Sequence, residues 1–154
     1  MKRSVVDDVV QPLTSTLGSD KTRISMALAI ALAFSLPLPT QRLDKGATPE
    51  LYYIQHQMNR VNRFISDFNE RFLIDVTEIA QATKTIFCTR YDMVYSRDPQ
   101  KLMSIARGSC PIKDYLAGFS FDEEVAGTVI SAGIASIDRI ERILLEEPSA
   151  SSGV

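Results

Sequence analysis

The chain has 154 residues, of which 45% are hydrophobic and 23% charged, and its formal net charge at pH 7 is −2. This length suffices for one domain with its own core, and the composition excludes wholesale disorder and a membrane-embedded bundle. Two cysteines without metal-ligand spacing exclude a disulfide framework and a Cys/His zinc site, so we expect a reducing environment, in the cytoplasm or within an assembled particle.

The charges are unevenly distributed along the chain. Residues 40–113 carry 11 basic against 8 acidic side chains, whereas residues 114–154 carry 2 against 8. A basic middle and an acidic end suit head-to-tail self-association or an anionic partner.

The N-terminal helices are predicted within residues 4–36. In the first of them, valines and leucines recur at helical spacing up to Leu17. Pro12 is expected to bend or split this helix, because its ring removes a backbone hydrogen bond. Gly18 is expected to end it.

The second helix is predicted to end near Leu36, with Ser19 or Asp20 as its N-cap. It is apolar nearly all round from Ile24, so it must be covered on most sides. Its apolar run is shorter than the roughly 20 residues that cross a bilayer. We therefore expect a buried core helix rather than a cleaved signal peptide, with membrane contact through residues 24–38 as the alternative.

The longest predicted element is one continuous helix over residues 49–96. It follows the proline-containing linker 37–47, begins with a threonine, a proline and a glutamate, and has no glycine or further proline. Apolar residues recur in sevens from Leu51 to Met93, which is the heptad pattern of helices that pack against partners. Such a helix would be on the order of 70 Å long and would project, or be covered by other subunits.

The heptad positions define a predicted interface with other helices or subunits. Asp75 interrupts its apolar run, and we expect this carboxylate either to pair with a basic side chain of a neighbouring helix or to turn outward. The predicted interface consists of Leu51, Ile54, Met58, Val61, Ile65, Phe68, Phe72, Asp75 and Ile79, with Ile130, Gly133 and Ile137 of the C-terminal helix.

The C-terminal helix is predicted over residues 121–146, after short helices within 99–118. Ser120 and Glu123 have the spacing of a capping box at its start. Small residues at spacing four would let another helix approach closely, and they are Gly127, Ser131 and Ala135.

These elements together predict an all-α fold, a helical bundle built on the long helix. No segment shows the alternation of apolar and polar residues that is typical of strands. We expect a single domain over residues 1–147, followed by a flexible tail at 148–154.

No catalytic site is predicted. The single histidine, His56, falls on the outermost heptad position, which predicts a surface side chain. Cys88 would lie roughly 48 Å from it along the same helix, and Cys110 belongs to a predicted helix start. Nucleotide-binding, metalloprotease and serine-hydrolase motifs are absent, so we expect no enzyme activity, cofactor, metal or small-molecule substrate.

A basic patch with interleaved tyrosines is the candidate for nucleic-acid binding. Lysine and arginine side chains bind the phosphate backbone, and tyrosine rings can stack on bases. The patch consists of Arg90, Arg97, Lys101, Arg107 and Lys113.

We expect a non-enzymatic structural protein that assembles with copies of itself into a helical or shell-like homo-oligomer, such as a viral coat or a secretion-filament subunit. Two alternatives remain open. One is a nucleic-acid-associated bundle that uses the basic patch. The other is a helical chaperone or adaptor that uses the same apolar stripe on a foreign helix.

Overall fold

The computed structural model describes residues 2–41, 43, 48–72, 76–95 and 121–146. This part of the chain is built from helices and contains no strand, so the predicted all-α fold is confirmed. The helices are α1 (Lys2–Leu17), α2 (Lys21–Ser35), α3 (Thr48–Phe72), α4 (Val76–Tyr95) and α7 (Glu123–Glu146).

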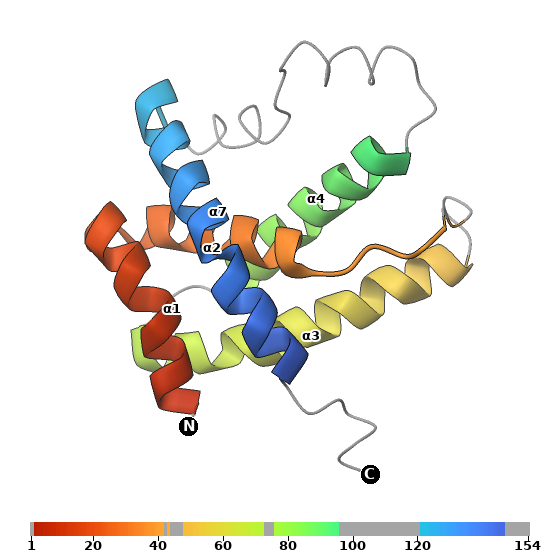
Figure 1. Ribbon diagram of the computed structural model, residues 1–154, viewed down its shortest axis with the longest axis horizontal. Helices are drawn as coiled ribbons and strands as arrows, with labels where there is room; N and C mark the ends of the chain where they lie inside the picture. Colours follow the sequence, from red (N-terminus) through yellow and green to blue (C-terminus); the bar gives the residue numbers. More distant parts are fainter. Residues whose placement is uncertain (1, 42, 44–47, 73–75, 96–120, 147–154) are drawn as a thin grey trace.

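Helix α2 lies at the centre of the described bundle (Figure 1). It packs most extensively against α7 and α4, and α1 covers it from a further side. Helix α3 packs along α4, and α1 also contacts α7. The bundle is therefore organised around one short central helix.

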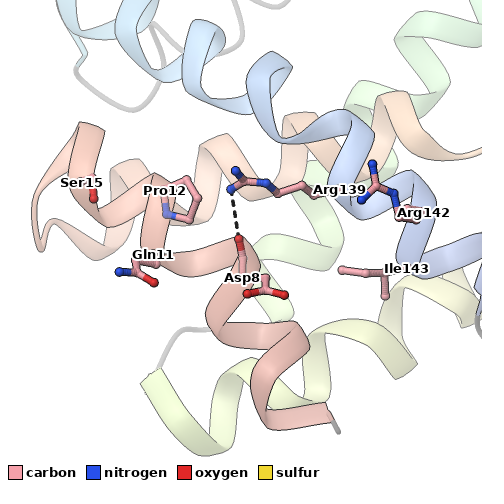
Figure 2. A pocket seen from close by; sticks show the side chains of 7 residues that line it. All are labelled: Asp8, Gln11, Pro12, Ser15, Arg139, Arg142 and Ile143. Carbon is pink, nitrogen blue, oxygen red and sulfur yellow. Dashed lines mark hydrogen bonds between the residues drawn. The ribbon is translucent and has the colours of Figure 1, made fainter.

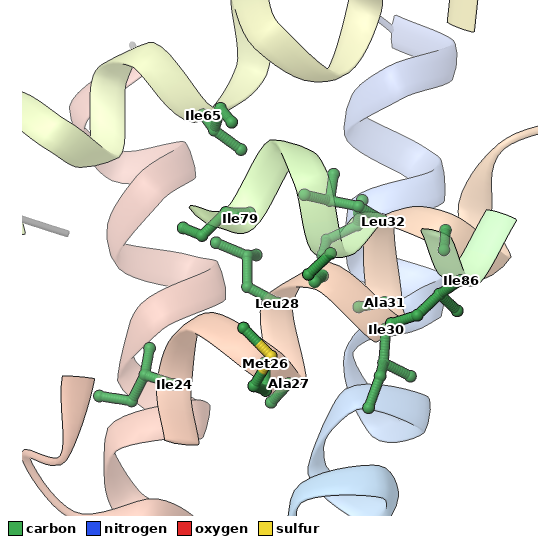
Figure 3. Packing of buried hydrophobic residues seen from close by; sticks show 14 of the residues in the cluster. Ile24, Met26, Ala27, Leu28, Ile30, Ala31, Leu32, Ile65, Ile79 and Ile86 are labelled. Atoms are coloured by element: carbon green, nitrogen blue, oxygen red, sulfur yellow. The ribbon is translucent and has the colours of Figure 1, made fainter. Parts of the chain in front are cut away.

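Helix α2 is buried on all sides because its sequence offers no polar face. Residues from Ile24 to Ala33 are all buried, as expected for a helix that is apolar all round. Large and small residues alternate along it, and Figure 3 shows its side chains beside Ile65 of α3 and Ile79 of α4. The alanines let neighbouring backbones come near, while the larger side chains fill the space between helices.

Local signals define the ends of α1 and α2 as predicted. The Gly18 backbone has φ +74°, a conformation that favours glycine, and its N–H donates to the Thr14 carbonyl at 2.8 Å. Asp20 is the N-cap of α2, since its carboxylate accepts a hydrogen bond from the Arg23 N–H at 3.1 Å. Helix α1 is not split at Pro12.

The single continuous helix predicted over residues 49–96 is not confirmed. Helix α3 ends at Phe72 and α4 begins at Val76, and the rings of Tyr53 and Phe87 stack with centroids 6.5 Å apart. In one continuous helix these rings would be about 50 Å apart. A heptad pattern places apolar residues on one face, but that face serves two shorter helices packed in one chain equally well.

Helix α7 begins differently from the prediction. Asp122 caps it, because the carboxylate accepts a hydrogen bond from the Val125 N–H at 2.7 Å. Ser120, the predicted capping residue, lies outside the described part of the chain. None of the described helices combines the length and the apolarity that crossing a membrane requires.

The close approach of α7 to α2 occurs at Gly133. A Cβ at this position would lie 2.8 Å from the Ala27 carbonyl oxygen and 3.0 Å from Ile30. The predicted row of small residues faces elsewhere, since Ser131 and Ala135 are exposed, and a Cβ at Gly127 would meet no atom within 4 Å.

Gly133→Ala should therefore destabilise the protein by about 1 to 3 kcal/mol, because the methyl group collides with backbone that cannot move independently. Gly127→Ala is the matched control, and it should raise stability by about 0.5 to 1 kcal/mol through helix propensity alone. Urea unfolding of both variants measures the difference. Equal effects at the two positions would show that the helices are not in close contact at Gly133.

Candidate functional site

The predicted interface lies largely within the core of the chain itself. The surrounding helices cover most of its described apolar side chains, so these residues do not require a second subunit to bury them. Residues that are buried or packed against the core are Met58, Val61, Ile65 and Ile79, with Ile54, Ile130, Gly133 and Ile137.

The remaining interface positions divide into two groups. Leu51, at the beginning of α3, is 58% exposed. The side chains of Phe68 and Phe72, and residue Asp75, lie outside the described part of the chain.

Arg90 is the one member of the predicted basic patch that the structure describes. Its guanidinium group makes contacts within the chain. Its Nη1 donates to the carbonyls of Ala33 at 2.9 Å and Leu36 at 2.6 Å. Its Cζ lies 5.6 Å from the centroid of the Phe34 ring. Burial lowers the pKa of Arg90, while the nearby Tyr53 opposes that shift.

A proline explains why Arg90 is needed. The Ala33 carbonyl would receive its helical hydrogen bond from residue 37, but Pro37 has no N–H. The guanidinium supplies the missing donor at the C-terminal end of α2. The Nη1 of Arg90 is therefore engaged within the chain, and Arg97, Lys101, Arg107 and Lys113 lie outside the described residues.

Tyrosines of α3 and α4 hold the segment that follows α2. Tyr53 donates its hydroxyl proton to the Pro37 carbonyl, and Tyr95 does so to the Pro39 carbonyl. The Tyr91 hydroxyl accepts a hydrogen bond from the Leu43 N–H at 2.8 Å. These bonds fix the segment against the first turns of α3 and the last turns of α4.

This arrangement creates an open pocket of about 690 Å³ between the segment and α3. No Asp, Glu, Lys or Arg is among the described residues that line it. Tyr52 lies at the pocket and is 77% exposed, next to the exposed Leu51. The lining residues are Pro39, Leu43, Thr48, Pro49, Tyr52, Tyr53 and His56. We call these residues together with Leu51 the aromatic surface.

His56 lies where the heptad count places it, on the exposed side of α3. The count does not reveal that it borders a pocket, because the other wall comes from the segment after α2. The sequence signal of this surface is the pair Tyr52 and Tyr53 early in α3, which lies outside the heptad series.

The described residues offer little for catalysis. Burial raises the pKa of the Cys88 thiol, with Lys84 as a weaker opposing influence, so the thiol favours its protonated, unreactive form. No cluster of three or more His, Cys, Asp or Glu side chains suited to a metal ion occurs in the described ranges. Cys110 lies outside them.

Protein-family models, curated proteins and solved structures all yield no match to this chain. The geometry of the chain itself is therefore the basis of the functional proposal.

Arg90→Met should lower the free energy of unfolding by about 2 to 3 kcal/mol, because it leaves two carbonyls at the end of α2 without a donor. Arg63→Met, at an exposed position of α3, is the control and should change stability by less than about 0.5 kcal/mol. Guanidinium unfolding monitored by circular dichroism provides the measurement. A tolerated Arg90→Met would mean that water replaces the guanidinium at no cost.

Tyr53 should make stability sensitive to alkaline pH. Burial raises the pKa of its phenol above the ordinary 10.0, against a smaller opposing effect of Arg90. The proton is thus held more tightly in the folded chain, and the resulting stability is complete below pH 10.0 and lost as pH rises beyond it. Tyr53→Phe should flatten this loss.

Urea unfolding from about pH 9 to 11 compares the wild type with Tyr53→Phe. Tyr52→Phe, which removes an exposed phenol, is the control and should keep the alkaline loss. If Tyr53→Phe loses stability as steeply as the wild type, the buried phenol is not its source.

Proposed function

We propose that the protein is a non-enzymatic helical protein that associates with copies of itself through the aromatic surface. The observation that carries this proposal is the highly exposed Tyr52 beside an apolar pocket whose described lining contains no Asp, Glu, Lys or Arg. Aromatic side chains that enter such pockets supply much of the binding energy in protein interfaces.

The shape of the surface favours a second copy of the chain as the partner. A protruding side chain and a pocket lie next to each other, so a twofold axis would place Tyr52 of each copy in the pocket of the other. Each contact would then be made twice, as in other isologous dimers.

The charge of the surface favours the same partner. When identical surfaces meet, every charge faces a like charge near the axis, and such pairs cost several kcal/mol. The described lining of the pocket consists of proline, leucine, threonine, tyrosine and histidine side chains, so these residues place no like-charged Asp, Glu, Lys or Arg side chains opposite each other. A foreign partner would impose no such requirement.

A larger helical or shell-like assembly needs a second contact in addition to this one, because a single twofold interface closes into a dimer. Ile134, which is 55% exposed on α7, is a position from which such a contact could be built. We therefore propose the dimer as the unit from which any larger assembly is made.

The experiment is sedimentation equilibrium of the purified protein over a wide concentration range. The wild type should dimerise, and Tyr52→Glu should weaken dimerisation by at least about thirtyfold, since it brings two carboxylates into an apolar contact. Tyr52→Phe should dimerise like the wild type because it keeps the ring.

Ile134→Glu is the control, since it adds the same charge at an exposed apolar residue on another helix. It should leave the dimer intact. A wild type that stays monomeric at all concentrations would refute the proposal and point to a foreign partner. Equal loss of dimer in Tyr52→Glu and Ile134→Glu would also refute the assignment to the aromatic surface.

A further inference from the structure

A second pocket lies between α1 and α7, on helices that do not contribute to the aromatic surface. Its volume is about 470 Å³, which is within the usual range for small-molecule sites. Figure 2 shows the side chains of both helices that line it. The lining residues are Asp8, Gln11, Pro12, Ser15, Arg139, Arg142 and Ile143.

Pro12 leaves a backbone acceptor in α1 that Arg139 contacts. Because proline has no N–H, the Asp8 carbonyl, four residues earlier in α1, loses its helical hydrogen bond. The Arg139 Nη1 donates to this carbonyl at 3.2 Å (Figure 2). This bond uses one of the five guanidinium N–H groups and places the others in the pocket wall.

Arg142 lies one helical turn further along α7 and lines the same pocket. Residues three apart on a helix are neighbours, so the two guanidinium groups can converge on one ligand. Among the side chains that the structure describes, the ion pair is between Arg23 and Asp20, and neither Arg139 nor Arg142 is paired with a carboxylate.

The facing wall supplies polar groups from α1. Gln11 and Ser15 are four residues apart, and both are exposed at the pocket. Pro12 and Ile143 supply its apolar part. Asp8 is the acidic residue of the lining, so the described lining carries one net positive charge.

We propose that this pocket binds the phosphate group of a small phosphorylated molecule. Two arginines on adjacent turns suit a phosphate, because planar guanidinium groups bind its oxygens in pairs. The Gln11 amide and Ser15 hydroxyl donate to further oxygens of the ligand. The Asp8 carboxylate repels the anion and so lowers its affinity. It accepts a hydrogen bond from a hydroxyl or amino group on the remainder of the ligand.

The test is isothermal titration calorimetry of the full chain with inorganic phosphate, adenosine monophosphate and adenosine. Both phosphate-containing probes should bind, and adenosine should not. Arg142→Gln should weaken phosphate binding at least about tenfold, because it removes charged hydrogen bonds without disturbing the bond from Arg139 to α1.

Asp8→Asn is the opposite test. It retains the backbone carbonyl that Arg139 contacts and removes the repelling charge, so phosphate should bind several times more tightly. Arg63→Gln on α3 is the control for a general loss of positive charge and should leave binding unchanged. All three variants should first show wild-type circular dichroism.

Several results would overturn the proposal. These are no heat with either phosphate-containing probe, equal weakening in Arg142→Gln and Arg63→Gln, and Asp8→Asn binding no more tightly than the wild type. Equal binding of adenosine and adenosine monophosphate would also contradict a site for phosphate. Because the pocket lies on α1 and α7, these outcomes are independent of whether the chain dimerises.

Discussion

The fold depends on a guanidinium group at the C-terminal end of α2. That helix is the centre of the bundle, and Pro37 ends it while depriving the Ala33 carbonyl of a donor. Arg90 supplies the donor and also donates to the Leu36 carbonyl, and its Cζ lies 5.6 Å from the centroid of the Phe34 ring. One side chain of α4 thus fixes the end of the core helix and the direction in which the chain leaves it. The tyrosine bonds to the following segment, and the pocket beside it, depend on that direction.

Arginines also donate to backbone carbonyls at two other places, within α1 and near the end of α7. Arg139 donates to the carbonyl that Pro12 leaves unpaired in α1. Arg60 Nη2 donates to the Leu144 carbonyl near the end of α7 at 3.1 Å, and the residue four positions later is Pro148. In each case a charged hydrogen bond connects two helices at a carbonyl without a helical partner. Arginines that are candidates for binding an external anion therefore use some of their N–H groups to connect helices within the chain.

Sequence patterns predicted the helix content, the burial of α2 and the ends marked by Gly18 and Asp20, because these are local properties. They did not predict the fold back between α3 and α4, since the heptad repeat continues through both helices and neither proline nor glycine separates them. Neither pocket was predicted either. The pocket at the aromatic surface requires the segment after α2 to lie on α3. The pocket between α1 and α7 requires Arg139 to reach α1. Such pairings between distant residues leave no periodic signal, and the interface that the heptad pattern predicts falls mostly on core residues.

The central position of α2 has a consequence for how the chain acquires its structure during synthesis. This apolar helix emerges early, yet its main neighbours are α4 and α7, and the contact at Gly133 comes more than a hundred residues after the first residues of α2. Until α7 is made, the most apolar element of the protein has no cover on that side. Contacts so distant in sequence slow folding and lengthen the time during which a nascent chain can aggregate. The alanines of α2 reduce the exposed apolar area during that interval, in addition to allowing the close packing of the finished bundle.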